Sequence, residues 1–290
     1  MHSEFFDLGT TKGRAIFVLP VPYEGMVSYG TGTGQGPGAL FAASVQIESL
    51  DPELDLDLAD LAHFISLPPV LPEEDGPEAL HRDMRQRLRE FNAAKDFILT
   101  LGGDHSVPLP LFEFYQKAHP NLVILHIDAH ADLRDSYEDS PFSHACIMAR
   151  ARALGIPLAQ IGIRSLCREQ RDFMRSQSPA ELLTLFAWNL PCPAEAAERV
   201  RLFVAGRPLY ISFDVDGMDP SVIPGTGTPE PGGIPYPWMA AFWKELWKDG
   251  LGPKLVGMDI CELAPIPGSQ VSESAAVKLL ARTLTAWLGL

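Results

Sequence analysis

The stretch LVILHIDAHADLRD, residues 122–135, indicates both the fold class and the place where chemistry occurs. Its first part, Leu122 to Ile127, is an apolar run of aliphatic side chains, which is typical of a strand buried in a parallel sheet. Acidic and histidine residues begin where the run ends. Successive side chains of an extended segment alternate between faces, so Asp128, His130 and Asp132 are expected to project to one side.

Similar apolar runs recur and alternate with segments of helical periodicity. The expected strands are Ala15 to Val21, Phe97 to Leu101, Leu122 to Ile127, Ile161 to Ile163, Leu209 to Phe213 and Leu255 to Met258. The expected helices are Glu78 to Ala93, Pro110 to Ala118, Ala194 to Ala205, Pro237 to Lys248 and Glu273 to Leu288. This alternation predicts an α/β fold with helices on both faces of a parallel sheet. No composition shift divides the chain, so residues 1–290 are expected to form a single domain.

Composition narrows the expected partners and cellular location. The 290 residues are 46% hydrophobic and 21% charged, an ordinary balance for a globular protein that argues against disorder and coiled coil. The formal net charge of -14 disfavours nucleic acid as a partner and favours cations. No stretch approaches the roughly 20 apolar residues that cross a bilayer, and the opening residues lack the features of a signal peptide. We therefore expect no membrane partner and a cytoplasmic location.

Three clusters of acidic and histidine residues each follow an apolar run: GGDHS at 102–106, DAHAD at 128–132 and DVDGMDP at 214–220. Ligands of such sheets bind beyond the carboxyl ends of the strands, so the three clusters can converge on one site. Carboxylates gathered in one cleft would raise one another's pKa steeply unless cations lay among them. Aspartate oxygens and imidazoles without thiolates suit manganese, although zinc, iron, cobalt or nickel could occupy the same ligands. The sequence thus predicts a divalent metal centre.

Structural alternatives apply to several of these residues. A single aspartate after a strand commonly caps a helix, but that explanation does not account for DAHAD and a second DxD together. His126 lies one step deeper in its strand than Asp128, so we interpret it as a core residue or a support for a ligand, with direct ligation as the minority alternative. Trp243 and Trp247 are expected to pack or to contact another subunit. His63, His81 and His119 have no partner motif and are expected to be solvated, and the four cysteines are expected to be buried free thiols.

Four motifs together resemble the ureohydrolases, the family of arginases and agmatinases. They are LGGDHS at 101–106, HIDAHADLRD at 126–135, SFDVDGMDPSVIPGTGTPEPGG at 212–233 and GMDICELAP at 257–265. The resemblance extends from VPYEG at 21–25 to the last expected helix. It implies a three-layer α/β/α fold with a central, mainly parallel eight-stranded sheet, and a homo-oligomer that is commonly a trimer or a hexamer.

The resemblance also implies two Mn²⁺ ions per subunit. One set of ligands would be His105, Asp128, Asp132 and Asp214, and the other would be His130, Asp128, Asp214 and Asp216, with Asp128 and Asp214 bridging. Four carboxylates balance the charge of two divalent cations, and a water molecule between the ions would lose its proton near neutral pH. The metal-bridging hydroxide would attack the carbon of a guanidinium group, and the ions would stabilise the tetrahedral intermediate.

Other positions match residues that surround the substrate in this family. Glu262 would hold the guanidinium by paired hydrogen bonds, the alternative being an ordinary surface ion pair. His144 would move protons, for which an imidazole is suited near neutral pH, the alternative being a helix N-terminal residue bonded to solvent. Thr228 would offer the guanidinium a second acceptor or serve only in a turn. With His144 and Glu262, the ligand Asp132 completes the expected catalytic set.

The substrate tail is less constrained by the sequence. Asp135, Glu138 and Asp139 follow the DAHAD motif and would attract the ammonium of agmatine, although a solvated acidic loop accounts for them equally well. Arg134 or Arg164 would instead pair with the carboxylate of an anionic substrate. The DLRD and FSHAC segments resemble prokaryotic agmatinases and favour a small cationic guanidinium substrate.

We therefore expect hydrolysis of agmatine to urea and putrescine, a step of polyamine biosynthesis. The alternative substrates are N1-aminopropylagmatine, guanidinobutyrate, arginine and formiminoglutamate, the last of which would release formamide. A non-enzymatic assembly subunit that keeps the fold is the alternative from a different functional class.

Overall fold

The computed structural model describes residues 4–26, 28–72, 74–250 and 252–290, and eight parallel strands form its main sheet. These strands are β1 (Arg14–Val21), β4 (Ala62–Ser66), β5 (Phe97–Gly102), β6 (Val123–Ile127), β7 (Leu158–Ile161), β8 (Leu182–Leu185), β9 (Leu209–Asp214) and β10 (Leu255–Cys261). Their order in the sheet is β4-β1-β5-β10-β9-β6-β7-β8, and every neighbouring pair is parallel. A small antiparallel pair, β2 (Leu50–Asp51) and β3 (Leu56–Asp57), lies apart from it.

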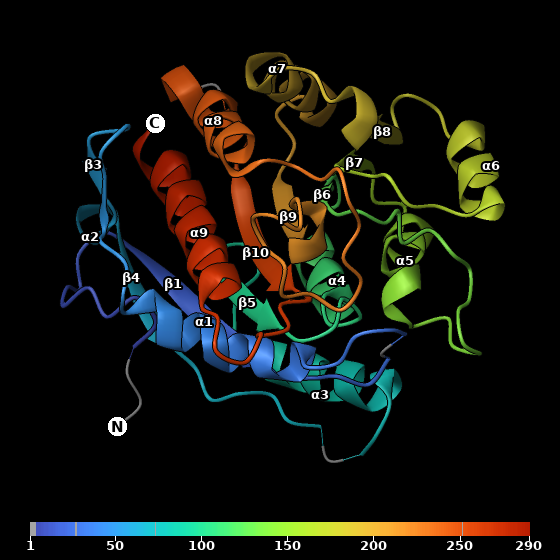
Figure 1. The fold of residues 1–290 in the computed structure, drawn as a ribbon, viewed down its shortest axis with the longest axis horizontal. Coiled ribbons are helices and arrows are strands. Elements are labelled where there is room, and N and C mark those ends of the chain that lie inside the picture. Colours follow the sequence, from blue (N-terminus) through green and yellow to red (C-terminus); the bar gives the residue numbers. More distant parts are fainter. Residues whose placement is uncertain (1–3, 27, 73, 251) are drawn as a thin grey trace.

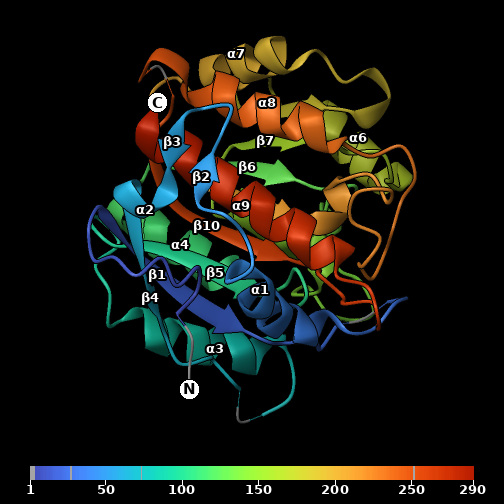
Figure 2. The same ribbon diagram turned by 60° about the vertical axis from the view of Figure 1, so that its left-hand side comes forward.

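Helices cover both faces of the sheet (Figures 1 and 2). The helices are α1 (Gly36–Ser44), α2 (Leu58–Leu61), α3 (Pro77–Leu88), α4 (Leu109–Ala118), α5 (Ile147–Ala153), α6 (Arg168–Ser176), α7 (Pro193–Val204), α8 (Tyr236–Trp247) and α9 (Val271–Gly289). One hydrophobic core joins α1, α7, α8 and α9 to the sheet, and a second core joins α3, α4 and α5 to it. The predicted three-layer α/β/α fold with a parallel eight-stranded sheet is confirmed.

Strand β6 shows how the residue pattern produces the two cores. Val123, Leu125 and Ile127 enter the core beneath α7, α8 and α9, whereas Ile124 enters the core beneath α3 and α4. Apolar side chains on both phases of the strand are therefore needed, and the continuous run in the sequence supplies them.

The sequence placed the central elements well and several peripheral ones poorly. The expected strand Ile161 to Ile163 lies earlier, at β7, because Gly162 has a φ of 100° and ends the strand. The helix expected to reach Ala93 ends at Leu88, and the following residues form turns closed by the Asn92 side chain. The edge strands β4 and β8 and the helices α1, α5 and α6 were not expected.

Three expectations about individual side chains were wrong. His81 is buried rather than solvated, because Nε2 lies 2.8 Å from the Ser106 carbonyl oxygen between α3 and the loop after β5. Cys192 is exposed and Cys167 is partly exposed, so only the other two cysteines are buried thiols. By contrast, Trp243 and Trp247 pack in the core, which is one of the two roles expected for them. In the described ranges, no helix is long and apolar enough to cross a membrane.

Candidate metal centre

The predicted site residues gather at the carboxyl ends of four adjacent strands. His105 follows β5, Asp128 follows β6, Asp214 ends β9 and Glu262 follows β10. These strands are neighbours in the order β5-β10-β9-β6, although they are far apart in the sequence. Parallel strands end at the same edge of a sheet, so their terminal side chains share one site.

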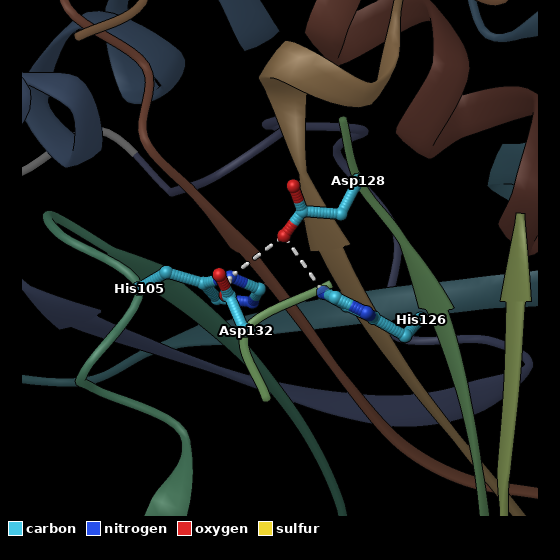
Figure 3. A group of neighbouring side chains, drawn as sticks. All are labelled: His105, His126, Asp128 and Asp132. Carbon is cyan, nitrogen blue, oxygen red and sulfur yellow. Dashed lines mark hydrogen bonds and ion pairs between the residues drawn. The ribbon is translucent and has the colours of Figure 1, made fainter. Parts of the chain in front are cut away.

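His105 lies among three carboxylates. Its Nδ1 atom lies 3.1 Å from Asp132 Oδ2, 3.3 Å from Asp128 Oδ2 and 3.4 Å from Asp214 Oδ2. Figure 3 shows His105, from the loop after β5, converging with Asp128 and Asp132, which both come from the segment after β6. All four side chains are buried, with at most 4% of any residue exposed. They can act as ligands for one ion.

A second group lies on the other side of Asp128. His130 Nδ1 is 3.0 Å from Asp216 Oδ2 and 3.5 Å from Asp128 Oδ1. Asp128 thus turns Oδ2 toward the first group and Oδ1 toward the second. A carboxylate that serves both groups with different oxygens is suited to bridge two ions.

Backbone groups hold these carboxylates in place. The Ala129 N–H donates to Asp216 Oδ1 (3.0 Å), and the Asp216 N–H donates to Asp214 Oδ1 (2.8 Å). Gly217 permits the close approach of the two loops, because a Cβ there would lie 2.7 Å from the Asp128 nitrogen. The DVDG and DAHAD loops therefore pack directly against each other, and each helps to hold the carboxylates of the other.

The electrostatics of the cluster call for positive charge. Burial and the carboxylates of Asp216 and Asp128 raise the pKa of Asp214 well above its usual range. Although burial opposes it, the Asp216 carboxylate raises the pKa of His130 to about 12. The protein without metal therefore retains protons at these groups. Divalent cations can replace those protons, so the donor set fits a metal centre.

Two members of the site have strained backbones. Asp132 has a φ of 51° and Glu262 has a φ of 65°, a left-handed conformation that is uncommon for residues other than glycine. Such conformations cost of order 1–3 kcal/mol and persist where surrounding contacts enforce them. The Asp132 carbonyl accepts hydrogen bonds from Met148 and Ala149, and the Glu262 N–H donates to the Gly103 carbonyl at 2.7 Å. This strain is consistent with a functional role for both side chains.

His126 contacts the cluster from below, with both ring nitrogens engaged. Nε2 lies 2.7 Å from Asp128 Oδ2, and Nδ1 lies 3.0 Å from Gln160 Nε2 (Figure 3 shows the first contact). Because the amide of Gln160 donates to Nδ1, the proton of the neutral ring is on Nε2 and points to Asp128. His126 is close enough to join the first group of ligands, but these bonds favour a supporting role. Gln160 was missed because no motif marks it; only its register with His126 brings it there.

An open cavity of about 330 Å³ lies above the ligands. Its described lining consists of Ser28, His130, Asp132, Arg134, Tyr137, His144, Ala145, Ser165, Leu166, Cys167, Gln170 and Thr228. His144 Nε2 lies 3.3 Å from Ser28 Oγ, and the Thr228 hydroxyl donates to Asp216 Oδ2 at 3.0 Å. Because its proton is used on Asp216, the Thr228 oxygen remains an acceptor. Ser28 carries no motif and was also missed.

Glu262 is a buried site residue, not part of a surface ion pair. It lines a small recess beside the cavity with Ser28, His144 and Thr228. Oε1 accepts the His105 N–H at 2.7 Å, whereas Oε2 faces Gly227. Burial and the nearby Asp104 carboxylate raise the pKa of Glu262 well above its usual range. A cation bound in the recess would lower this pKa and stabilise the ionised carboxylate.

The acidic residues expected at the mouth do not line the cavity. Asp135 points outward to Arg150, 2.6 Å away, and its side chain is 87% exposed. Glu138 is exposed in a turn. Arg164 is not available to a substrate carboxylate, because its guanidinium donates to five backbone carbonyl groups, those of Gly162, Asp216, Gly217, Met218 and Glu230. Arg134 lines the cavity and stacks on the Tyr137 ring at 5.1 Å.

A parallel α/β sheet with histidine and aspartate side chains gathered at its strand ends, below an open cavity, is typical of an enzyme with a metal centre. The chain belongs to the arginase family, whose model matches residues 14–285. The predicted resemblance to ureohydrolases is thereby confirmed, and the chain is a hydrolase of this family.

Individual relatives cover almost the whole chain. An N(1)-aminopropylagmatine ureohydrolase of Synechocystis sp. is 30% identical over 278 residues, which are 94% of this chain and 89% of the relative. An agmatinase of Bacillus cereus is 30% identical over 276 residues, covering 94% and 92%. The crystal structure of a putative agmatinase from Clostridium difficile superposes with a TM-score of 0.85 at 26% identity and covers 95% of this chain and 98% of that one.

Proposed function

We propose that this protein is a manganese-dependent ureohydrolase that cleaves the guanidinium C–N bond of agmatine and releases urea and putrescine. The observation that carries the proposal is the position of Asp128, whose two oxygens face separate groups of ligands. That arrangement supports a binuclear centre. Aspartate and imidazole ligands without thiolate support manganese.

Six residues would hold the two ions. His105, Asp128, Asp132 and Asp214 would bind one ion, and His130, Asp128, Asp214 and Asp216 would bind the other. The four carboxylates would neutralise the charge of two divalent cations. When bound, the ions would activate a water molecule as a nucleophile near neutral pH.

The acceptor groups that face the recess beside the candidate ligands suit a guanidinium group. Glu262 Oε2 and the Thr228 oxygen are both acceptors, and a planar cation with several N–H donors can use both. His144 lies between the recess and the open cavity, where it would carry protons between solvent and the leaving amine. Guanidinium binding would thus place the reacting carbon over the ligand cluster.

N1-aminopropylagmatine is the second candidate substrate. The relative named as an N(1)-aminopropylagmatine ureohydrolase and the relative named as an agmatinase are both 30% identical to this chain. The cavity is open, and its outer lining offers the neutral polar side chains of Ser165, Cys167 and Gln170. A longer polyamine tail would be accommodated along this wall.

The test is urea release by protein reconstituted with Mn²⁺, beside a chelated control. Agmatine, N1-aminopropylagmatine, guanidinobutyrate and arginine would be ranked by kcat/KM, and formamide release would be assayed separately with formiminoglutamate. Metal-dependent turnover led by agmatine is the expected result. If another compound has the highest kcat/KM, the assignment of agmatine as the substrate is wrong. If metal-loaded protein turns over none of these compounds, the proposed activity is wrong.

The proposal extends to the cellular setting. We infer a cytoplasmic enzyme of polyamine synthesis that assembles as a trimer or hexamer of identical chains. Light scattering coupled to size-exclusion chromatography would test the assembly, and a monomer at micromolar concentration would contradict it.

A further inference from the structure

Two buried residues line up behind His105, on the side away from the other ligands. His105 Nε2 lies 2.9 Å from Ser212 Oγ, and Ser212 Oγ lies 3.1 Å from Asp259 Oδ1. Ser212 on β9 and Asp259 on β10 are directly paired in the sheet register, and both residues are completely buried. No solvent is available to replace either contact.

The chemistry of the neighbours fixes the direction of these hydrogen bonds. The Cys261 thiol also donates to Asp259 Oδ1, at 3.7 Å, so this oxygen acts as an acceptor. The single proton of the Ser212 hydroxyl is used on Asp259. The lone pairs of Ser212 then face His105, which must donate from Nε2.

This direction has a consequence at the ligand cluster. With its proton held on Nε2, neutral His105 presents a lone pair on Nδ1. That atom faces Asp128, Asp132 and Asp214 at 3.1–3.4 Å. The side chains of Ser212 on β9 and Asp259 on β10 therefore fix both the orientation of the His105 ring and the ring nitrogen that can bind a metal.

We propose that Ser212 and Asp259 are positioning residues that hold His105 in the tautomer and orientation needed to bind the first metal ion. This inference rests on the proposed binuclear centre. Hydrogen bonds to the distal nitrogen of a metal-binding histidine fix its tautomer, and their loss commonly weakens metal affinity about 10–100-fold.

The test compares Ser212→Ala and Asp259→Asn with a matched control, Thr100→Val. Thr100 on β5 pairs with Asp259 in the register and is fully buried, but its hydroxyl has no partner among the described residues. The control therefore removes a buried hydroxyl from the same layer without touching His105. Stepwise Mn²⁺ affinity would be measured by calorimetry on metal-stripped protein, with Co²⁺ absorption as a report on ligand geometry.

Ser212→Ala is expected to weaken one of the two binding steps about 10–100-fold and to alter the Co²⁺ spectrum. Asp259→Asn keeps an acceptor oxygen but can also turn its amide toward Ser212, so a smaller loss in the same step is expected. Ser212→Thr keeps the hydroxyl and should bind more tightly than Ser212→Ala. Thr100→Val should match wild type.

Thermal unfolding of each metal-stripped variant separates loss of the fold from loss of the hydrogen bonds that position His105. If Ser212→Ala does not fold, Asp259→Asn and Ser212→Thr decide. Folded variants with wild-type affinities and spectra would overturn the inference, as would an equal loss in Thr100→Val. Wild-type protein that binds fewer than two ions would instead refute the proposed centre itself.

Discussion

The ligand cluster and the rim of the cavity differ sharply in how they are held. Every carboxylate of the cluster is buried and bonded to backbone or to another side chain, and the cluster lies on the ends of parallel strands. The rim, by which we mean the loop of residues 133–140, lines the cavity only through Arg134 and Tyr137, and its acidic residue Asp135 is 87% exposed. Under the proposed function, reaction chemistry would therefore belong to the sheet, whereas the choice of substrate tail would belong to the loops.

The largest effect is expected when the shared carboxylate is removed. Asp128→Ala deletes the side chain that faces both groups of candidate ligands, so metal content and activity should fall together. Activity should fall at least a thousandfold, which corresponds to a loss of more than about 4 kcal/mol of transition-state stabilisation. Metal analysis beside urea release would check this. Asp135→Ala is the matched control for loss of an aspartate and should keep its metal. Full metal content with full activity in Asp128→Ala would contradict the assignment.

The second prediction concerns the recess between cluster and rim. Glu262→Gln preserves the shape and can still accept the His105 N–H, but it removes the charge opposite the guanidinium. We expect kcat/KM to fall roughly thirtyfold or more, which corresponds to a loss of about 2 kcal/mol of transition-state stabilisation, with metal content unchanged. Steady-state kinetics and metal analysis would decide, and wild-type kcat/KM would exclude the role given to Glu262.

The cluster was predictable from sequence because each motif directly follows an apolar strand, so position along the chain implied position in space. Residues supplied by neighbouring strands could not be found in this way. Gln160 and Ser212 reach the site only through sheet register, and Ser28 reaches it from a loop. The edge strand β8 was missed although its residues, LLTL, are mostly apolar, because a run of only four residues does not distinguish a strand from a turn of helix.

The rim was the least predictable region, for a physical reason. Asp135 follows the candidate ligand Asp132 by three residues, yet the chain turns there and the Asp135 side chain contacts Arg150 instead of the cavity. Exposed loops have few contacts that restrict their side chains, so proximity in sequence does not imply proximity to the substrate.

A third prediction places His144 between the two regions. His144→Ala should lower kcat about a hundredfold, within the usual range for loss of general acid–base catalysis, and should change the pH profile. Both metals should remain bound, because His144 contacts Ser28 and does not belong to either ligand group. An unchanged kcat and pH profile would remove His144 from proton transfer.

The fourth prediction uses the protons of the cluster. The pKa of His130 is raised to about 12 in the metal-free protein, so the protonated ring contributes stability below about pH 6.5 that is lost progressively as the pH rises toward 12. Metal-free protein should therefore melt at a lower temperature at pH 9 than at pH 6. Metal binding at pH 7 should release protons, detectable by calorimetry in buffers of different ionisation enthalpy. No proton release would contradict the electrostatics of the cluster.

The smallest effect is expected at the rim. Asp135→Asn and Glu138→Gln remove exposed charges that lie outside the cavity lining, and exposed ion pairs contribute about 0–1 kcal/mol. The kcat for agmatine should be unchanged, and KM should rise less than about fivefold, with the rise disappearing at high salt because only long-range attraction is lost. Asp172→Asn, on the exposed face of α6, controls for net charge. A salt-independent loss of more than tenfold would mean that the loop after DAHAD closes onto the substrate, and the division between a rigid cluster and a permissive rim would then fail.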